Sequence, residues 1–459
     1  MYSVHMKTTK YIFLFALAWC GVAVKSYAQQ VTADSTTYFT LQDCINYAYQ
    51  HQDTVINAAL DIKSAEYKVK EATATGLPQI NGSASFQDYL KIPSQPVEAN
   101  EFDPQAPPGK IIPISLALKY STTVGGNISQ MIFSPSFFVG LQAAKTYKEL
   151  SQRSYTRSKI ETNVNVSKAY YQVLVSNEQI GLLDANIKQL QQQLNETVQE
   201  NKQGLVEKVD VDRLTVQYNN VVTTRENTLR LLVLNYQMLK FQMGMPIGRY
   251  IILTDKLENV KLDSLALEAS TDTSFYRKRI EYGLLETNIH LNQLDLKNKK
   301  AAFLPSLTAN GNLSTAFYSN TFGGLYTYNY PFSYIGLTLN IPIFDGGTRI
   351  NQLRESRIAV MKSENDMENL KNAISLQASS SRVSYVNSLK TLDVQKQNRV
   401  LAEEVFHVAR VKYQQGVGSS LEVTQAETDL VNADNQYIQS LYNSLISKID
   451  LDQAYGNIK

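Results

Sequence analysis

The sequence predicts a mostly α-helical fold with a β contribution, in which four strands of the chain belong to a transmembrane barrel. Three observations lead to this fold class. Two tracts, 136–245 and 343–459, contain none of the 12 prolines, and a proline inside a helix costs roughly 3 kcal/mol, so both tracts are free to be helical. The second half of the chain repeats landmarks of the first. Between the expected helices, the hydrophobic pattern changes to a period of two.

The first 28 residues read as a secretory signal peptide. A charged start, an apolar run and small residues before the cleavage point are supplied by Lys7, Lys10, Tyr11–Val24, Ser26 and Ala28. The apolar run is too short to cross a bilayer comfortably, and no later run is long enough for a membrane helix. A lipoprotein leader with Cys20 as the lipidated residue is the alternative, but Trp19 occupies a position where that motif has a small residue. Export is expected in either case.

The chain is duplicated with an offset of about 212 residues. Gly204 and Gly416 are 212 positions apart, and so are Gly244 and Gly456. Agreement over such a length indicates an internal repeat. The predicted organisation is a signal peptide at 1–28, a first repeat at 29–244, an equatorial linker at 245–271 and a second repeat at 272–459.

Each repeat reads as helix, strand, strand, long helix and helix. The residue before a proline avoids the α region, so Leu77-Pro78 and Leu304-Pro305 end the first helix of each repeat. Gly204 and Gly416 end the long helices in the manner of a C′ glycine. The predicted helices are 41–75, 137–203, 206–243, 272–302, 346–415 and 419–455, and the predicted strands are 79–90, 114–133, 306–318 and 333–344.

The long helices are expected to be coiled-coil partners. A helix over 137–203 would be ~100 Å long, and two shorter helices stacked end to end would match it. Apolar residues recur every seven positions at Val173, Ile180, Ile187 and Leu194, which favours a left-handed supercoil. A tall cylinder of paired helices follows.

The strand segments alternate apolar and polar side chains, as transmembrane strands do. In 114–128, Ile114, Leu116 and Leu118 begin one apolar face, and 335–341 has apolar residues at its odd positions. Tyrosines near the strand ends suggest an interfacial girdle, formed by Tyr89, Tyr318, Tyr326, Tyr328, Tyr330 and Tyr334. A soluble sandwich has the same alternation, but the very long flanking helices favour the barrel.

Four strands cannot close a membrane barrel, which needs about eight, and unpaired strand edges are not viable in lipid. The chain must therefore oligomerise. Two copies would give eight strands and three would give twelve, and these patterns alone leave both open.

Composition excludes several functions. The net charge of +2 lacks the basic excess of a nucleic-acid binder, so no nucleic-acid partner is expected. His51, His290 and His407 are far apart in sequence, and Cys44 is the only cysteine after the leader, so neither a metal site nor an intrachain disulfide is supported. No nucleotide-binding or hydrolase motif is present. We expect no cofactor and no enzymatic activity.

Short motifs, each weak alone, recur in order through the mature chain, and together they resemble the outer membrane efflux protein family of TolC-like channels. They are Phe39-Thr40-Leu41-Gln42-Asp43, Leu77-Pro78, Leu304-Pro305, Ile341-Pro342-Ile343-Phe344-Asp345-Gly346-Gly347, Gly204-Leu205-Val206 with Val209-Asp210-Val211, and Tyr413-Gln414-Gln415-Gly416 with Leu421-Glu422-Val423. The resemblance implies a homotrimer with a twelve-stranded barrel in outer-membrane lipid and a helical barrel in the periplasm.

The resemblance also implies a passive exit duct of a tripartite efflux pump or a type I secretion system. The helical tips would contact a periplasmic adaptor, the membrane fusion protein, which couples the duct to an inner-membrane transporter. The residues implied in adaptor contact are the two tip turns, Gly204, Leu205, Val206, Gly416, Val417 and Gly418.

Family channels narrow their periplasmic entrance with acids, and by resemblance Glu422 takes that position as a ring of three carboxylates. Gln425 stands where a second acid is sometimes found. Asp210 and Tyr413 align with a linking pair, whereas Gly418 replaces a linking arginine, which indicates a different way of holding the gate closed. Each acid also suits the first turn of a solvated helix.

Two other functions fit parts of the pattern. An exported trimeric coiled-coil scaffold or adhesin without a pore would share the leader and the heptads. A passive uptake porin would share the strands, but porins lack long periplasmic helices. The transported substrate cannot be named from these residues, because the channel interior is generic.

Overall fold

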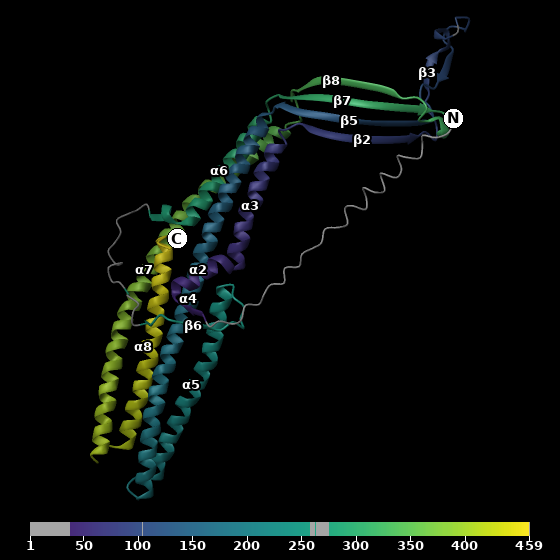
Figure 1. Ribbon diagram of the computed structural model, residues 1–459. Coiled ribbons are helices and arrows are strands. Elements are labelled where there is room, and N and C mark those ends of the chain that lie inside the picture. The colour runs from purple at the N-terminus through teal and green to yellow at the C-terminus, as the bar shows by residue number, and fades with distance from the viewer. Residues whose placement is uncertain (1–36, 103, 258–261, 263–274, 459) are drawn as a thin grey trace.

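The computed structural model describes residues 37–102, 104–257, 262 and 275–458. Long helices run side by side away from one antiparallel sheet, which lies at one end of the molecule (Figure 1). The helices are α2 (Leu41–His51), α3 (Asp53–Ala74), α4 (Pro135–Lys202), α5 (Lys208–Gln242), α6 (Ile280–Ala301), α7 (Thr348–Gln414) and α8 (Ser420–Ala454). The signal peptide lies outside the described residues, and so do 258–261 and 263–271 of the predicted linker.

The long helix α4 is the centre of the helical layer. Its sheet-proximal part packs between α3 and α6, its distal part packs between α5 and α8, and α7 covers α6 and α8. Two shorter helices therefore stand beside each long one, as the lengths predicted. At the distal end, Leu183 and Leu190 of α4 pack against Leu214 and Val221 of α5, which is the expected apolar seam.

The prediction of one continuous helix over 41–75 is wrong in one respect, because the helix is interrupted at Gln52. This residue has ψ 124°, and its side-chain Oε1 accepts a hydrogen bond from the Asp53 N–H at 2.8 Å. The break turns α2 aside, so that Cys44 and Ala48 enter a buried cluster with Val166 and Tyr170 of α4. A straight helix would have left this apolar face in solvent.

The helix predicted over 272–302 also begins later than expected. Residues 272–274 lie outside the described part, a 3₁₀ turn, η4, occupies Phe275–Lys278, and α6 starts at Ile280. Two segments without a predicted strand pair in parallel near the middle of the molecule, β1 (Thr37–Phe39) with β6 (Ile251–Leu253). Asp255 follows β6 and joins α2 to α4, since it accepts from the Leu41 N–H at 2.9 Å and from the Tyr170 hydroxyl at 2.7 Å.

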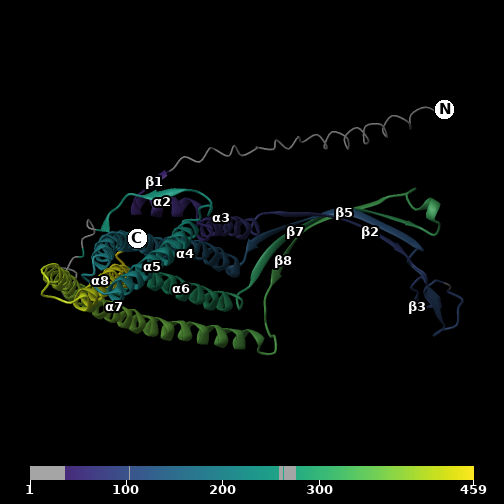
Figure 2. The ribbon, with the colours of Figure 1, turned by 90° about the horizontal axis from the view of Figure 1, so that it is seen from below.

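The main sheet contains β2 (Gln79–Asp88), β5 (Tyr120–Phe133), β7 (Ser306–Ser319) and β8 (Tyr330–Asn340) in the order β2-β5-β7-β8. All neighbours are antiparallel. The sheet bends as it leaves the helices (Figure 2). β2 and β8 have no partner on their outer sides among the described strands.

The register separates an apolar from a polar face, because residues directly opposite on antiparallel strands point to the same side. One cross-strand row on the apolar face is Ile80, Ile128, Gly311 and Ile335. The next row on the polar face is Asn81, Asn127, Asn312 and Tyr334. Asn312 donates a side-chain hydrogen bond to Asn127 within that row. The alternation read from the sequence is therefore real in space.

The predicted strand 114–133 is too long at its beginning. β5 starts at Tyr120, which lies opposite Asp88 and Ser319, the last residues of β2 and β7. Ile114 instead closes β4 (Ile111–Ile114), which pairs with β3 (Gln95–Glu98) in a separate hairpin beyond the sheet (Figure 1). Leu116 and Leu118 are not in a strand.

The tyrosines of the predicted girdle lie on both sides of the sheet. Tyr326 lies on the apolar side, where its ring contacts Phe317 and its hydroxyl is 3.4 Å from the Thr122 hydroxyl. Tyr330 and Tyr334 lie on the polar face, opposite Ala316 and Asn312, and Tyr318 shares that face by alternation. Because the apolar residues of β8 occupy its odd positions, its even-numbered aromatics must point the other way.

Among the described residues, no helix combines the length and apolar character needed to cross a bilayer.

Candidate functional site

The two turns at the far end of the helices have the same backbone geometry. Gly204 and Gly416 have φ of 78° and 73°, in the left-handed region that favours glycine. The Gly204 N–H donates to the Asn201 carbonyl at 2.9 Å, and the Leu205 N–H donates to the Glu200 carbonyl at 3.0 Å. The Gly416 and Val417 N–H groups repeat these bonds at 2.9 and 3.0 Å. Both long helices thus end in a Schellman motif.

Each tip presents an apolar side chain to solvent. Leu205 is 71% exposed and Val417 is 78% exposed, and the two positions are equivalent in the repeat. Val206 is half-buried, while Gly204, Leu205, Gly416 and Val417 are exposed, and Gly418 is half-buried. Exposed apolar side chains at the end of a helical hairpin present a surface for contact with another protein.

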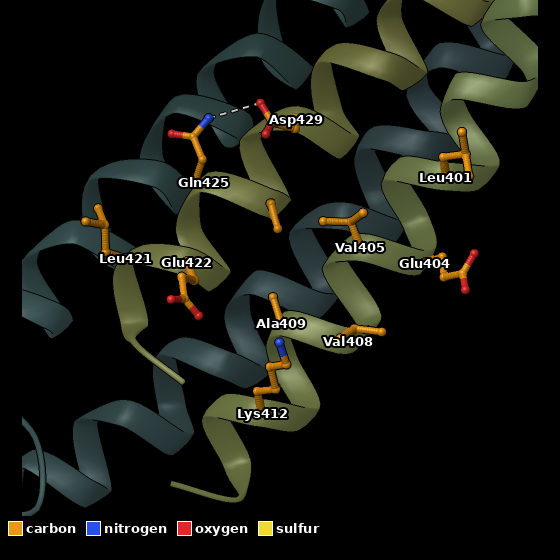
Figure 3. A pocket seen from close by; sticks show the side chains of 11 residues that line it. Leu401, Glu404, Val405, Val408, Ala409, Lys412, Leu421, Glu422, Gln425 and Asp429 are labelled. Atoms are coloured by element: carbon orange, nitrogen blue, oxygen red, sulfur yellow. Dashed lines mark hydrogen bonds between the residues drawn. The ribbon is translucent and has the colours of Figure 1, made fainter. Parts of the chain in front are cut away.

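Glu422 lies at the start of α8, where its N–H donates to the Ser419 hydroxyl at 3.2 Å. Its side chain is exposed and lines a groove of about 690 Å³ between α7 and α8. Figure 3 shows Lys412 on the facing helix, and the lining of the groove includes the apolar side chains of Val405 and Leu421. Gln425 is held on the same side of α8 by a 3.0 Å hydrogen bond to Asp429.

Asp210 and Tyr413, the predicted linking pair, lie near each other. Burial raises the pKa of the Tyr413 hydroxyl, and the nearby carboxylates of Glu200 and Asp210 raise this pKa further. The hydroxyl makes no hydrogen bond of regular geometry to the described residues. Asp210 is paired instead with Arg213, at 3.3 Å. The structure describes no contact that joins Glu422 to this pair.

Gly418 has a local reason to lack a side chain. Its N–H donates to the Lys412 carbonyl at 3.1 Å, which draws the turn against the end of α7. A Cβ at this position would lie 3.0 Å from both the Lys412 Cβ and the Tyr413 N. The side chain of an arginine at this position would crowd the turn. The geometry of the turn therefore disfavours the linking arginine here.

The sequence analysis missed Glu427, a carboxylate buried 11 residues beyond Gly416. It is 2% exposed, and neither carboxylate oxygen has a hydrogen-bond partner among the described residues. Burial raises its pKa to about 8, and Arg410 opposes this pKa shift. The signal was available, because position 427 follows Val423 and precedes Leu430 with core spacing.

Another buried acid in this helix is paired. Asp434 is 6% exposed and accepts a 2.8 Å hydrogen bond from the Arg399 Nε of α7. No cluster of three metal-ligating His, Cys, Asp or Glu side chains occurs within the described part of the chain. The tip region therefore contains exposed apolar side chains, carboxylates and a groove between α7 and α8.

A known protein family matches most of the chain. The family model described as "Outer membrane efflux protein" matches residues 44–232 and 287–457, which is most of the chain. The chain belongs to the outer membrane efflux protein family. The expected membership is thereby confirmed, and family members are channel proteins of the outer membrane.

The individual relatives have low sequence identity to this chain, but each match covers most of both chains. The outer membrane protein TolC of Vibrio cholerae is 22% identical over 91% of both chains. A probable efflux pump outer membrane protein, TtgC of Pseudomonas putida, is 22% identical over 86% of this chain and 78% of its own. The open-state MtrE outer membrane channel of Neisseria gonorrhoeae superposes with a TM-score of 0.71 at 17% identity, over 91% of this chain and 88% of its own.

These comparisons confirm the predicted fold class, a mostly helical fold with a β contribution, and the outer-membrane location. They support an efflux role for this family member without naming a substrate.

Proposed function

We propose that the protein is the outer-membrane exit duct of a tripartite efflux pump or a type I secretion system. Small molecules or proteins would pass from a periplasmic entrance to the exterior, with the energy supplied by a partner. The observation that carries the proposal is a pair of free edges along the whole molecule. β2, α3 and α5 form one edge, and β8 and α7 form the other (Figure 1).

Both helical edges carry exposed apolar side chains that a single chain leaves without cover. On α5 they are Val216, Leu231, Leu234, Met238 and Phe241, and on α7 they are Leu376, Val383, Val394, Leu401 and Val405. The spacings of three and four residues from Leu231 to Phe241, and of seven residues from Leu376 to Val383 and from Val394 to Leu401, are typical of coiled-coil seams. The α5 edge of one copy therefore fits the α7 edge of the next, and such head-to-tail contacts generate a closed ring.

The sheet edges support the same arrangement. In lipid the unpaired N–H and C=O groups of β2 and β8 would each cost several kcal/mol, so β2 of one chain pairs with β8 of its neighbour. A homotrimer supplies twelve strands, within the range of outer-membrane barrels. The apolar face then meets outer-membrane lipid and the polar face lines the pore.

The tips would bind the periplasmic adaptor, which links the duct to the inner-membrane transporter. Leu205 and Val417 are the apolar contacts, and the turns at Gly204, Val206, Gly416 and Gly418 set their direction. Glu422 would form the acidic constriction, and the Tyr413–Asp210 neighbourhood would help to hold it closed.

The duct is tested by reconstitution into planar bilayers and by imaging. We expect outer-membrane trimers that conduct ions and extend roughly 100 Å from the membrane. A soluble trimer without conductance would contradict the duct and would indicate an exported scaffold or adhesin. A conducting protein without the extension would indicate a porin.

The constriction is tested in the same bilayers with Glu422→Gln. Replacing three carboxylates by amides should lower the preference for cations, because the ring's negative charge is removed. Glu364→Gln, which changes an exposed acid of α7 far from the tip, is the control. Unchanged ion selectivity in Glu422→Gln would remove this residue from the constriction.

A further inference from the structure

The polar face of the sheet carries aromatic rings at the end far from the helices. Phe332 lies opposite Ser314, and Tyr330 and Tyr334 lie opposite Ala316 and Asn312. Tyr318 follows on the same face, with its ring centroid 5.7 Å from that of Tyr330. We call Tyr318, Tyr330, Phe332 and Tyr334 the aromatic patch. It occupies adjoining parts of β7 and β8 (Figure 1).

The rings of the patch are about half exposed. Their exposed fractions are 44% for Tyr318, 54% for Tyr330, 47% for Phe332 and 59% for Tyr334. Buried rings stabilise a sheet, whereas an exposed cluster on an otherwise polar face indicates a contact site. The Tyr318–Tyr330 contact is the one ring pair described inside the patch.

The surroundings of the patch are small and uncharged. On the same face β5 offers Ser121, Thr123 and Asn127, and β2, which would adjoin β8 of the next copy, offers Ser83 and Ser85. The described residues of this face in the four strands include no Asp, Glu, Lys or Arg. Small neighbours leave the ring faces open, and the lack of charge gives an ion no partner.

We propose that the aromatic patch is a cargo-binding site in the pore for uncharged, planar aromatic molecules. The proposal rests on the proposed duct, whose polar sheet face lines the pore. Ring faces bind other planar rings by stacking, and the three patches of a trimer would surround the pore at one level. Weak contacts suit a duct, because a site that conducts must also release its cargo.

The patch is not explained by contact with lipid. That role fits the rings on the opposite side, where Phe322 packs against Phe86 and Tyr120 at centroid distances of 6.2 and 5.8 Å. Two aromatic sets therefore lie on the two sides of the same end of the sheet. Only the patch faces the proposed pore.

The test measures blockade of single-channel current by coumarin, a neutral planar bicycle, against its saturated analogue. In wild-type channels, coumarin should cause longer blockades than the saturated molecule. The Tyr330→Ser/Phe332→Ser/Tyr334→Ser variant should shorten coumarin residence roughly tenfold or more, because stacking partners are lost. The matched control, Phe322→Ser/Tyr326→Ser, removes rings from the other side and should leave the residence time unchanged.

A single substitution covers the possibility that the triple variant fails to insert. Phe332→Leu keeps an apolar side chain but loses the ring, so the coumarin residence time should fall while the open-channel conductance stays the same. Channels that conduct normally but hold coumarin no longer than its saturated analogue would overturn the patch alone. Wild-type protein that forms no channel would overturn the duct, and with it this site.

Discussion

The two helical tips have one backbone and two different sets of side chains. Both end a long helix with a left-handed glycine and the same pair of carbonyl bonds. The following helix differs, because the side chain of Ser419 caps α8, whereas Glu207, the N-cap residue of α5, makes no side-chain cap bond. Further along, Glu427 is buried in α8, and the equivalent position in α5 is Thr215, 212 residues earlier.

This difference separates what a duplicated fold retains from what each copy can change. The turn geometry depends on a glycine and is retained in both halves. The polar groups inside the helical layer are not retained in both halves. The Thr215 hydroxyl donates to the Val211 carbonyl at 2.8 Å, whereas the Glu427 carboxyl has no hydrogen-bond partner among the described residues. The second tip therefore contains a group whose stability contribution changes with pH.

The largest expected effect concerns that buried acid. The folded pKa of Glu427 is raised to about 8 from an ordinary value of 4.5, so its contribution is fully present below pH 4.5 and is lost as pH rises through 8. Between pH 4.5 and about pH 8, the unfolding free energy of each chain should fall by up to about 1.4 kcal/mol for each pH unit. Thermal unfolding in detergent across pH measures this slope.

Glu427→Gln should remove that part of the pH dependence, because an amide does not titrate. Glu422→Gln is the control, since it removes an exposed carboxylate five residues away and should keep the slope. An unchanged slope in Glu427→Gln would show that the buried carboxyl does not control it, and the two tips would then differ less than their burial suggests.

The second largest expected effect concerns the left-handed glycine that each tip contains. Gly204→Ala and Gly416→Ala should each destabilise the protein by about 1–2 kcal/mol, because an L side chain is strained at these φ values. The two losses should be similar, since a Cβ meets no atom within 4 Å at either site. Gly181→Ala, within α4 and equally open, should stabilise by roughly 0.5–1 kcal/mol. Clearly unequal losses at the tips would refute their equivalence.

The smallest effect concerns the helix starts. Ser419→Ala should cost ~1 kcal/mol, because the Glu422 N–H loses its acceptor. Glu207→Ala removes no side-chain cap bond and should change stability by less than about 0.5 kcal/mol. Equal costs in urea or thermal unfolding would mean that the Ser419 cap adds nothing to the second tip.

Sequence patterns predicted the elements that depend on periodicity and on special residues. The long helices, the end of each at a glycine, and the alternation of 335–341 all follow from local rules. The break at Gln52 could not be predicted this way, because it is imposed by packing of Cys44 and Ala48 against α4. The late start of β5 is likewise set by where β2 ends.

The candidate site shows the same division. The glycine turns and the position of Glu422 at a helix start were predictable, and the proximity of Tyr413 to Asp210 came from resemblance. The burial of Glu427 depends on how α7 and α8 pack, although its spacing from Val423 and Leu430 already indicated a core position. The assignment of Tyr330 and Tyr334 failed because position near a strand end says nothing about which face a ring occupies.

The unpaired edges of β2 and β8 also constrain how the protein is made. A lone chain cannot satisfy these backbone groups inside a bilayer, and in water the same edges invite aberrant pairing. For the proposed duct, we therefore expect insertion to be a collective event, in which chains associate before or while they enter the membrane. The yield of mature protein then rises steeply with the concentration of unassembled chains, and a newly exported chain needs protection of both edges until its neighbours arrive.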